Sequence, residues 1–68
     1  MESDMRELEA LLEYLVKHNE DHAQEIMDLA ARAQDLGKTE VHEHLVHGVD
    51  LLNQSNESLK AALTVLRG

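Results

Sequence analysis

The chain has 68 residues, and fourteen Asp and Glu against six Lys and Arg give it a formal charge of −8 with the five histidines neutral. This charge repels phosphate backbones and anionic lipid surfaces, which argues against nucleic-acid and membrane partners. The chain has no cysteine, which excludes disulfides and thiolate metal sites, and Tyr14 is its one aromatic residue. Such a composition packs helices more readily than strands, so we expect a single all-α domain over residues 1–68.

The first expected helix covers about residues 4–36. Apolar residues recur along it in alternating steps of three and four, as they do on one face of a helix. These residues are Met5, Leu8, Leu12, Leu15, Ile26, Leu29, Ala33 and Leu36. The same steps pass through Asn19 and His22 without a change of phase, which favours one continuous helix. The alternative is a break near Asn19, because Lys17 and His18 are typical of a helix end and Asn19 is typical of an N-cap.

The second expected helix covers about residues 40–66, after a turn at 37–39. Gly37 can adopt the left-handed conformation that ends a helix, and Thr39 can be the next N-cap. The second stripe consists of Val41, Leu45, Gly48, Leu52, Ser55, Leu59, Ala62 and Leu66. So short a turn makes the helices antiparallel neighbours. The interior Gly48 costs helix stability, so we expect it to permit close approach of Leu29 or of a neighbouring chain.

One seam between two helices cannot offset the conformational entropy that is lost when 68 residues become ordered. Further apolar residues flank both stripes, namely Leu11, Val16, Ala23, Ala30, Val49, Leu51, Leu63 and Val65. Such a wide stripe is typical of a four-helix bundle. We therefore expect a long antiparallel hairpin that forms a homodimer with twofold symmetry. The alternative, which a break near Asn19 would produce, is a monomeric three-helix bundle.

Two histidines at the centre of the first helix are candidate metal ligands. His18 and His22 are four residues apart, so their rings lie on one face within reach of a single ion. In the antiparallel register, Glu57 lies at about the same height on the second helix. Imidazole ligands suit Ni, Zn or Co, and a second copy could bring further ligands to the same layer.

The same region can also be interpreted as a purely structural polar layer. In that case its side chains would hydrogen-bond one another and fix the register, as a core Asn does in coiled coils. The expected members of this layer are Asn19, His22, Ser55 and Asn56. A third interpretation is a pH-sensitive interface, since histidine titrates near neutral pH.

Three more histidines lie near the start of the second helix. The sequence His42-Glu43-His44-Leu45-Val46-His47 is not an H-E-x-x-H zinc motif, because Val46 stands where the second histidine is needed. His44 and His47 share a face and are weaker, exposed metal candidates. Roughly 22 Å of helix, at 1.5 Å per residue, separates this group from His18, so the two groups cannot share one ion within a hairpin.

The chain resembles a small prokaryotic family of helical domains of unknown function. The resemblance is carried by an H-N-E-x-H-A motif at residues 18–23 and by Asn56-Glu57-Ser58-Leu59, where the family pattern is A-N-E-x-L. Ser55 replaces the usual Ala, and Tyr14 stands where some relatives are expected to have another histidine. The resemblance implies no known activity. It makes His18, Asn19, His22 and Asn56 the residues to test.

No arrangement of residues typical of a catalytic site is found in the sequence, so we do not expect an enzyme. The sequence has neither a long apolar run nor a basic, apolar leader, and we expect a soluble, cytoplasmic protein. The expected function is that of a small homo-oligomeric protein whose central His/Asn layer binds a transition metal. The alternative is an interaction or dimerisation module without a metal, with itself or an unidentified protein as partner.

Overall fold

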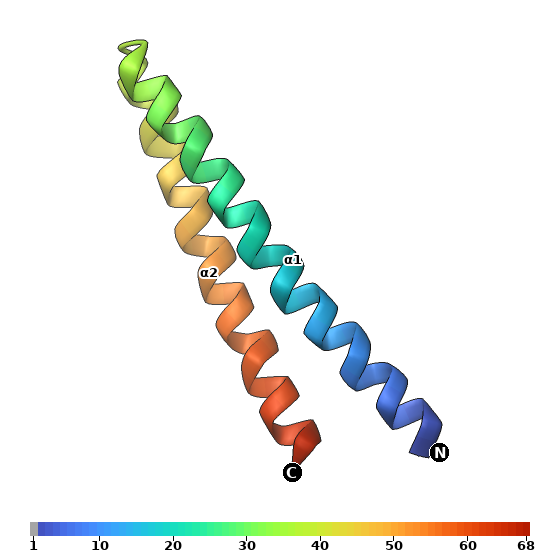
Figure 1. Ribbon diagram of the computed structural model, residues 1–68. Coiled ribbons are helices and arrows are strands. Elements are labelled where there is room, and N and C mark those ends of the chain that lie inside the picture. Colours follow the sequence, from blue (N-terminus) through green and yellow to red (C-terminus); the bar gives the residue numbers. More distant parts are fainter. Residues whose placement is uncertain (1) are drawn as a thin grey trace.

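The computed structural model describes residues 2–68, which form two long helices. Helix α1 is Glu2–Asp35 and helix α2 is Thr39–Arg67. The helices pack side by side as an antiparallel hairpin whose Cα atoms span 53 × 14 × 11 Å (Figure 1). The expected helical hairpin is confirmed. The three-helix alternative is wrong, because α1 passes through Asn19 without interruption.

Side-chain pairs one turn apart stabilise the centre of α1, where the alternative placed a break. Lys17 Nζ donates a hydrogen bond to Asp21 Oδ1 at 3.0 Å, and Gln24 Nε2 donates one to Asp28 Oδ1 at 3.1 Å. Such i,i+4 pairs form only when the backbone between them is helical. The polar residues of this stretch therefore support the helix instead of ending it.

The turn is a Schellman motif built on Gly37, which has a φ of +74°. The Lys38 N–H donates to the Ala33 carbonyl at 2.8 Å, and the Gly37 N–H donates to the Gln34 carbonyl at 3.0 Å. The expectation that Thr39 is an N-cap is wrong. Lys38 is the N-cap, without a side-chain hydrogen bond, and Thr39 is the first residue of α2. The connection therefore has the expected length of three residues, but it covers residues 36–38, one position earlier than expected.

The seam between the helices consists of buried and half-buried residues in steps of three and four. Its α1 members are Glu9, Leu12, Val16, Asn19, Ala23, Ile26, Ala30 and Ala33. Its α2 members are His42, Leu45, Val49, Leu52, Asn56, Leu59, Leu63 and Leu66. Asn19 contacts Asn56, and Glu20 contacts Lys60, close to the register expected from the short turn.

The seam is rotated on both helices relative to the expected stripes. Half of each stripe is as expected, but at the other positions the next residue along the chain faces the partner helix. Ala23 is buried in place of His22, and Asn56 in place of Ser55. Within the hairpin, His22 and Ser55 therefore do not occupy the core positions that the stripes predicted. Both stripes obey the same spacing, and alanine allows the closer approach of two helix backbones.

This rotation also moves Gly48 out of the seam, where Val49 takes its place. Nothing lies within 4 Å of the point that a Cβ atom at Gly48 would occupy. The expected close approach of Leu29 to this glycine is therefore wrong, and within the hairpin Gly48 borders open space.

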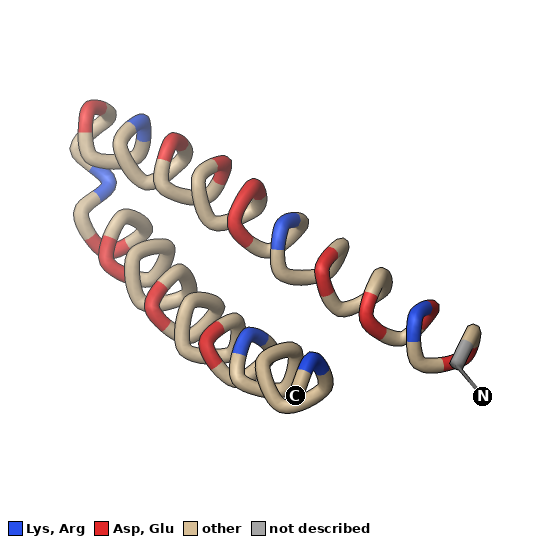
Figure 2. The backbone as a smooth tube through the Cα atoms, turned by 60° about the horizontal axis from the view of Figure 1, so that its bottom comes forward, with Lys and Arg blue, Asp and Glu red and all other residues tan. Residues whose placement is uncertain are grey.

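The spacing of the helices follows the size of the seam side chains. In α1 the seam is formed by Ala33, Ala30 and Ala23 towards the turn, and by Val16 and Leu12 towards the N-terminus. In Figures 1 and 2 the two helices lie closest near the turn and diverge towards the termini. None of the larger side chains in the described part of the chain is fully buried. Among residues 2–68, neither helix is long and apolar enough to cross a membrane.

Candidate functional site

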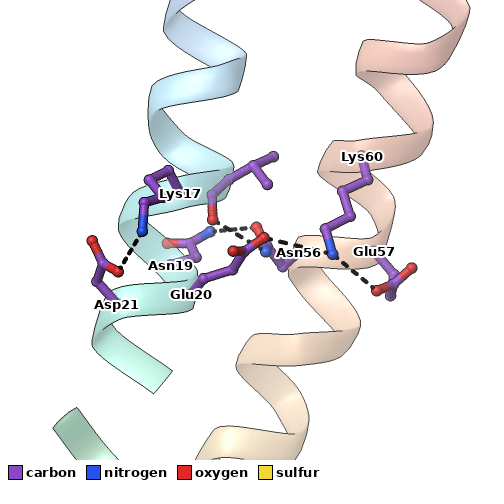
Figure 3. A network of polar contacts seen from close by, with 8 residues as sticks. Lys17, Asn19, Glu20, Asp21, Asn56, Glu57 and Lys60 are labelled. Atoms are coloured by element: carbon purple, nitrogen blue, oxygen red, sulfur yellow. Dashed lines mark hydrogen bonds and ion pairs between the residues drawn. The ribbon is translucent and has the colours of Figure 1, made fainter. Parts of the chain in front are cut away.

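A pair of asparagines forms the polar layer of the seam. Asn56 is 4% exposed and is the one polar residue that is buried in the described part of the chain. Asn19 Nδ2 donates to Asn56 Oδ1 at 3.2 Å, and Asn56 Nδ2 donates to the Val16 carbonyl at 3.3 Å (Figure 3). Both polar ends of the Asn56 amide are therefore satisfied, and a shift in register would leave them unpaired.

Ion pairs between the helices mark one edge of the seam. Lys60 Nζ lies 3.7 Å from Glu20 Oε1, and Arg67 bridges Glu9 and Glu13, with its Nε 2.7 Å from Glu9 Oε1. We call Glu13, Glu20, Lys60 and Arg67 the charged edge. These side chains are partly exposed, so each ion pair contributes at most about 1 kcal/mol to stability. Each of these four residues directly follows a seam residue in the sequence. The ion pairs therefore show that such residues of both helices lie on the same side of the hairpin.

The opposite edge carries apolar and small residues, and we call it the open face. On each helix its members recur every seven residues, and almost all of them directly precede a seam residue. In α1 and the turn they are Leu8, Leu15, His22, Leu29 and Leu36. In α2 they are Val41, Gly48, Ser55 and Ala62. All are exposed, and no element of the described chain covers them.

The central histidines lie on and beside this open face. His18 Nε2 and His22 Nε2 are 2.8 Å apart with perpendicular rings, so one nitrogen donates a hydrogen bond to the other. Tyr14 stacks on His18 with ring centroids 5.5 Å apart, and His22 Nδ1 lies 3.4 Å from Glu25 Oε2. Two imidazole nitrogens thus converge on one point at the surface.

The third expected ligand is elsewhere. Glu57 Oε1 lies 3.6 Å from Lys60 Nζ, beside the charged edge (Figure 3). Over residues 2–68, no three side chains of His, Cys, Asp or Glu are close enough together to hold a metal ion. The structure therefore does not bring Glu57 to His18 and His22 within one chain, because the seam rotation turned the histidines away from α2. One hairpin supplies two of the ligands that a metal centre needs.

The histidines near the start of α2 have separate environments. His42 Nδ1 donates to the Ala30 carbonyl at 2.8 Å and is half-buried in the seam. Sequence reasoning missed this role, although the spacing of 42, 45, 49 and 52 contained the signal. His44 is exposed, with its Nε2 3.9 Å from Glu40 Oε1, and His47 is exposed as well.

One family model matches the chain, over residues 8–66, and its description is Domain of unknown function (DUF8180). The matched region begins in α1, includes the turn and ends in α2, so it contains the polar layer, the histidine pair and the whole open face. Searches of curated proteins and of solved structures found no match. The resemblance to a helical family of unknown function is confirmed, and the chain belongs to the family Domain of unknown function (DUF8180).

Proposed function

We propose that the protein is a dimerisation module in which two hairpins pack open face against open face to form a four-helix bundle. The observation that carries the proposal is the contrast between the two edges of the seam. One edge is paired by charges, whereas the other leaves leucines such as Leu29 half exposed in a regular row. Exposed apolar rows of this kind mark interaction surfaces in soluble proteins.

The size of the open face suits a second copy. The Cα extents of 53 and 14 Å outline a flat footprint of roughly 740 Å² per hairpin, which is of the same order as the ~800 Å² of accessible surface that each partner buries in a typical stable interface. A symmetric dimer would bury the open face of both copies. No other element of the described chain could cover this face, because the two helices form a single layer.

The α1 row is symmetric about His22. Leu15 and Leu8 precede it by seven and fourteen residues, and Leu29 and Leu36 follow it at the same distances. A twofold axis at His22, perpendicular to the helices, places Leu15 opposite Leu29 of the second copy. The same axis places Leu8 opposite Leu36. Large residues thereby meet large ones in an antiparallel pair of α1 helices.

The α2 row fits the same axis. Its small residues Gly48 and Ala62 lie seven residues before and after Ser55, which the hairpin register places within about two residues, or about 3 Å, of the level of His22. The axis therefore brings Gly48 opposite Ala62 of the second copy, and the small side chains let the two α2 helices approach closely. A glycine inside a helix costs about 1 kcal/mol relative to alanine, and within one chain Gly48 has no neighbour to explain it.

A twofold axis parallel to the helices is the other way to stack two open faces. That arrangement pairs each α1 with α2 of the second copy at unchanged height. Because α1 extends past the end of α2, Met5 would stay uncovered in both copies, and Leu8 would lie at the level of Arg67, the last residue of α2. The perpendicular axis covers Leu8 with the turn of the second copy, and we therefore favour it.

The polar layer supports this assembly indirectly. Asn19 and Asn56 fix the register of the hairpin, and that register decides whether His22 and Ser55 share one level. A slip of the seam would separate the centres of the two rows, so that no single axis could satisfy both. The polar layer would thus specify the dimer while lying inside each hairpin.

Single-cysteine variants test the proposed axis, because the chain has no cysteine of its own. With Ser55→Cys, the two thiols lie close to the axis and should form a disulfide between copies, which requires Cα atoms about 4.4–6.8 Å apart. The matched control is Gln54→Cys, an exposed neighbour outside the open face. We expect covalent dimer from Ser55→Cys at micromolar protein concentration and little from Gln54→Cys. Equal cross-linking of both variants, or a monomeric wild-type protein in sedimentation equilibrium, would refute the proposal.

A further inference from the structure

We infer that the histidine pair His18–His22 of each chain binds a divalent transition-metal ion that is shared with the same pair of a second copy. This inference rests on the proposed dimer, because one hairpin contributes only two ligands. With a site of this kind, the dissociation constant of the dimer would depend on metal binding.

The geometry of the pair suits chelation. The two Nε2 atoms are 2.8 Å apart and face each other. An ion about 2.1 Å from both nitrogens would hold them about 3.0 Å apart at a right angle and about 3.4 Å apart in a tetrahedron. A small rotation of either ring meets the first distance. Right-angled coordination is typical of Ni(II), which selects imidazole nitrogen, so Ni(II) is the best probe.

Neighbouring side chains orient both rings for this purpose. Glu25 Oε2 lies 3.4 Å from His22 Nδ1, on the side of the ring opposite to His18. A proton held on Nδ1 by that carboxylate leaves the Nε2 lone pair free, as in the carboxylate–histidine pairs of metal sites. Tyr14 stacks on the other ring and restricts the rotation of His18.

The proposed axis completes the ligand set. It passes at His22, so the His22 rings of two copies meet there. Each His18 ring already lies within hydrogen-bond distance of its own His22 nitrogen, and it can reach the same ion. Helical bundles hold metal ions with such side chains from facing helices. Each chain carries a formal charge of −8, so metal binding would also relieve repulsion between the two copies.

Calorimetry and sedimentation on the full chain test the inference together. Sedimentation equilibrium in EDTA measures the dimer without metal, and titration of the metal-free protein with NiCl2 measures the site. We expect one Ni(II) per two chains and a smaller dimer dissociation constant with Ni(II) present. His22→Gln removes a ligand and should weaken Ni(II) binding at least about 100-fold. Loss of a residue that only hydrogen-bonds a ligand can already weaken metal binding by up to about that factor. His44→Gln removes one of the weaker, exposed metal candidates of α2, which lies outside the open face, and it should leave the binding of one Ni(II) per two chains unchanged.

The outcomes separate the two proposals. A dimer in EDTA that shows no saturable Ni(II) binding, or whose binding survives His22→Gln, overturns the metal site and leaves the dimerisation module standing. A monomer in EDTA overturns the dimerisation module. Binding of one Ni(II) per chain, with the dimer constant unchanged, overturns the shared site. Circular dichroism of His22→Gln shows whether the hairpin itself is retained, as we expect for an exposed side chain.

Discussion

Substitution of Leu15 by Glu is the sharpest test of the open face. Leu15 is 42% exposed in the hairpin, and in the proposed bundle this exposed part is buried. Full burial of a leucine is worth about 1.5–3 kcal/mol, so the remaining part contributes about 0.6–1.3 kcal/mol per copy, and both copies of a symmetric dimer lose it. A total of about 1.3–2.5 kcal/mol raises the dissociation constant roughly 10- to 70-fold. The carboxylates, which would be buried without partners, raise it further.

Met27→Glu is a closely matched control for this measurement. Met27 is 40% exposed on the same helix, but it belongs to the edge that carries the interhelix ion pairs. Both variants therefore lose similar packing within the hairpin, whereas only Leu15→Glu places charge in the interface. Sedimentation equilibrium over a range of protein concentrations measures the two constants. If both variants dimerise equally well, the open face is not the interface and the reasoning fails.

Three further results are expected from the hairpin itself. Asn56→Ala should lower the free energy of unfolding in urea by about 1–3 kcal/mol at matched protein concentration, because Asn19 and the Val16 carbonyl lose their hydrogen-bond partner. An unchanged urea midpoint would show that the polar layer does not fix the register. Gly37→Ala should lower the same free energy of unfolding by about 1–2 kcal/mol at matched protein concentration, because its φ is +74°. In the Leu15→Glu background, which weakens the dimer, Gly48→Ala should raise the helix content measured by circular dichroism, since alanine favours a helix over glycine by up to about 1 kcal/mol and open space surrounds that position in the hairpin; a lower helix content would contradict the structure.

The histidines show how far sequence reasoning could go at the candidate site. Their spacing of four residues is a local property of a helix, so the contact between His18 and His22 followed from the sequence once the helix was continuous. Their burial and their proximity to Glu57 depended on which face of α1 meets α2. Nothing in the sequence measures that rotation, and for this reason the structure does not bring Glu57 to the two histidines within one hairpin.

The sequence by itself determined the secondary structure and the topology. An unbroken three-and-four spacing without proline made α1 continuous, Gly37 ended it, and the short turn forced an antiparallel hairpin with nearly the expected register. These features are local, because each depends on residues within a few turns of one another.

Tertiary structure decided which of two overlapping stripes became the seam. Leu15 and Val16, or Leu29 and Ala30, are adjacent apolar residues, so either member of each pair satisfies the helical period. The choice depends on the partner helix. Alanines allow the backbones to approach, and the Asn56 amide is satisfied only where it meets Asn19 and the Val16 carbonyl. That packing turned the leucine row and its central histidine outward, and it thereby exposed residues whose pattern alone indicated a core.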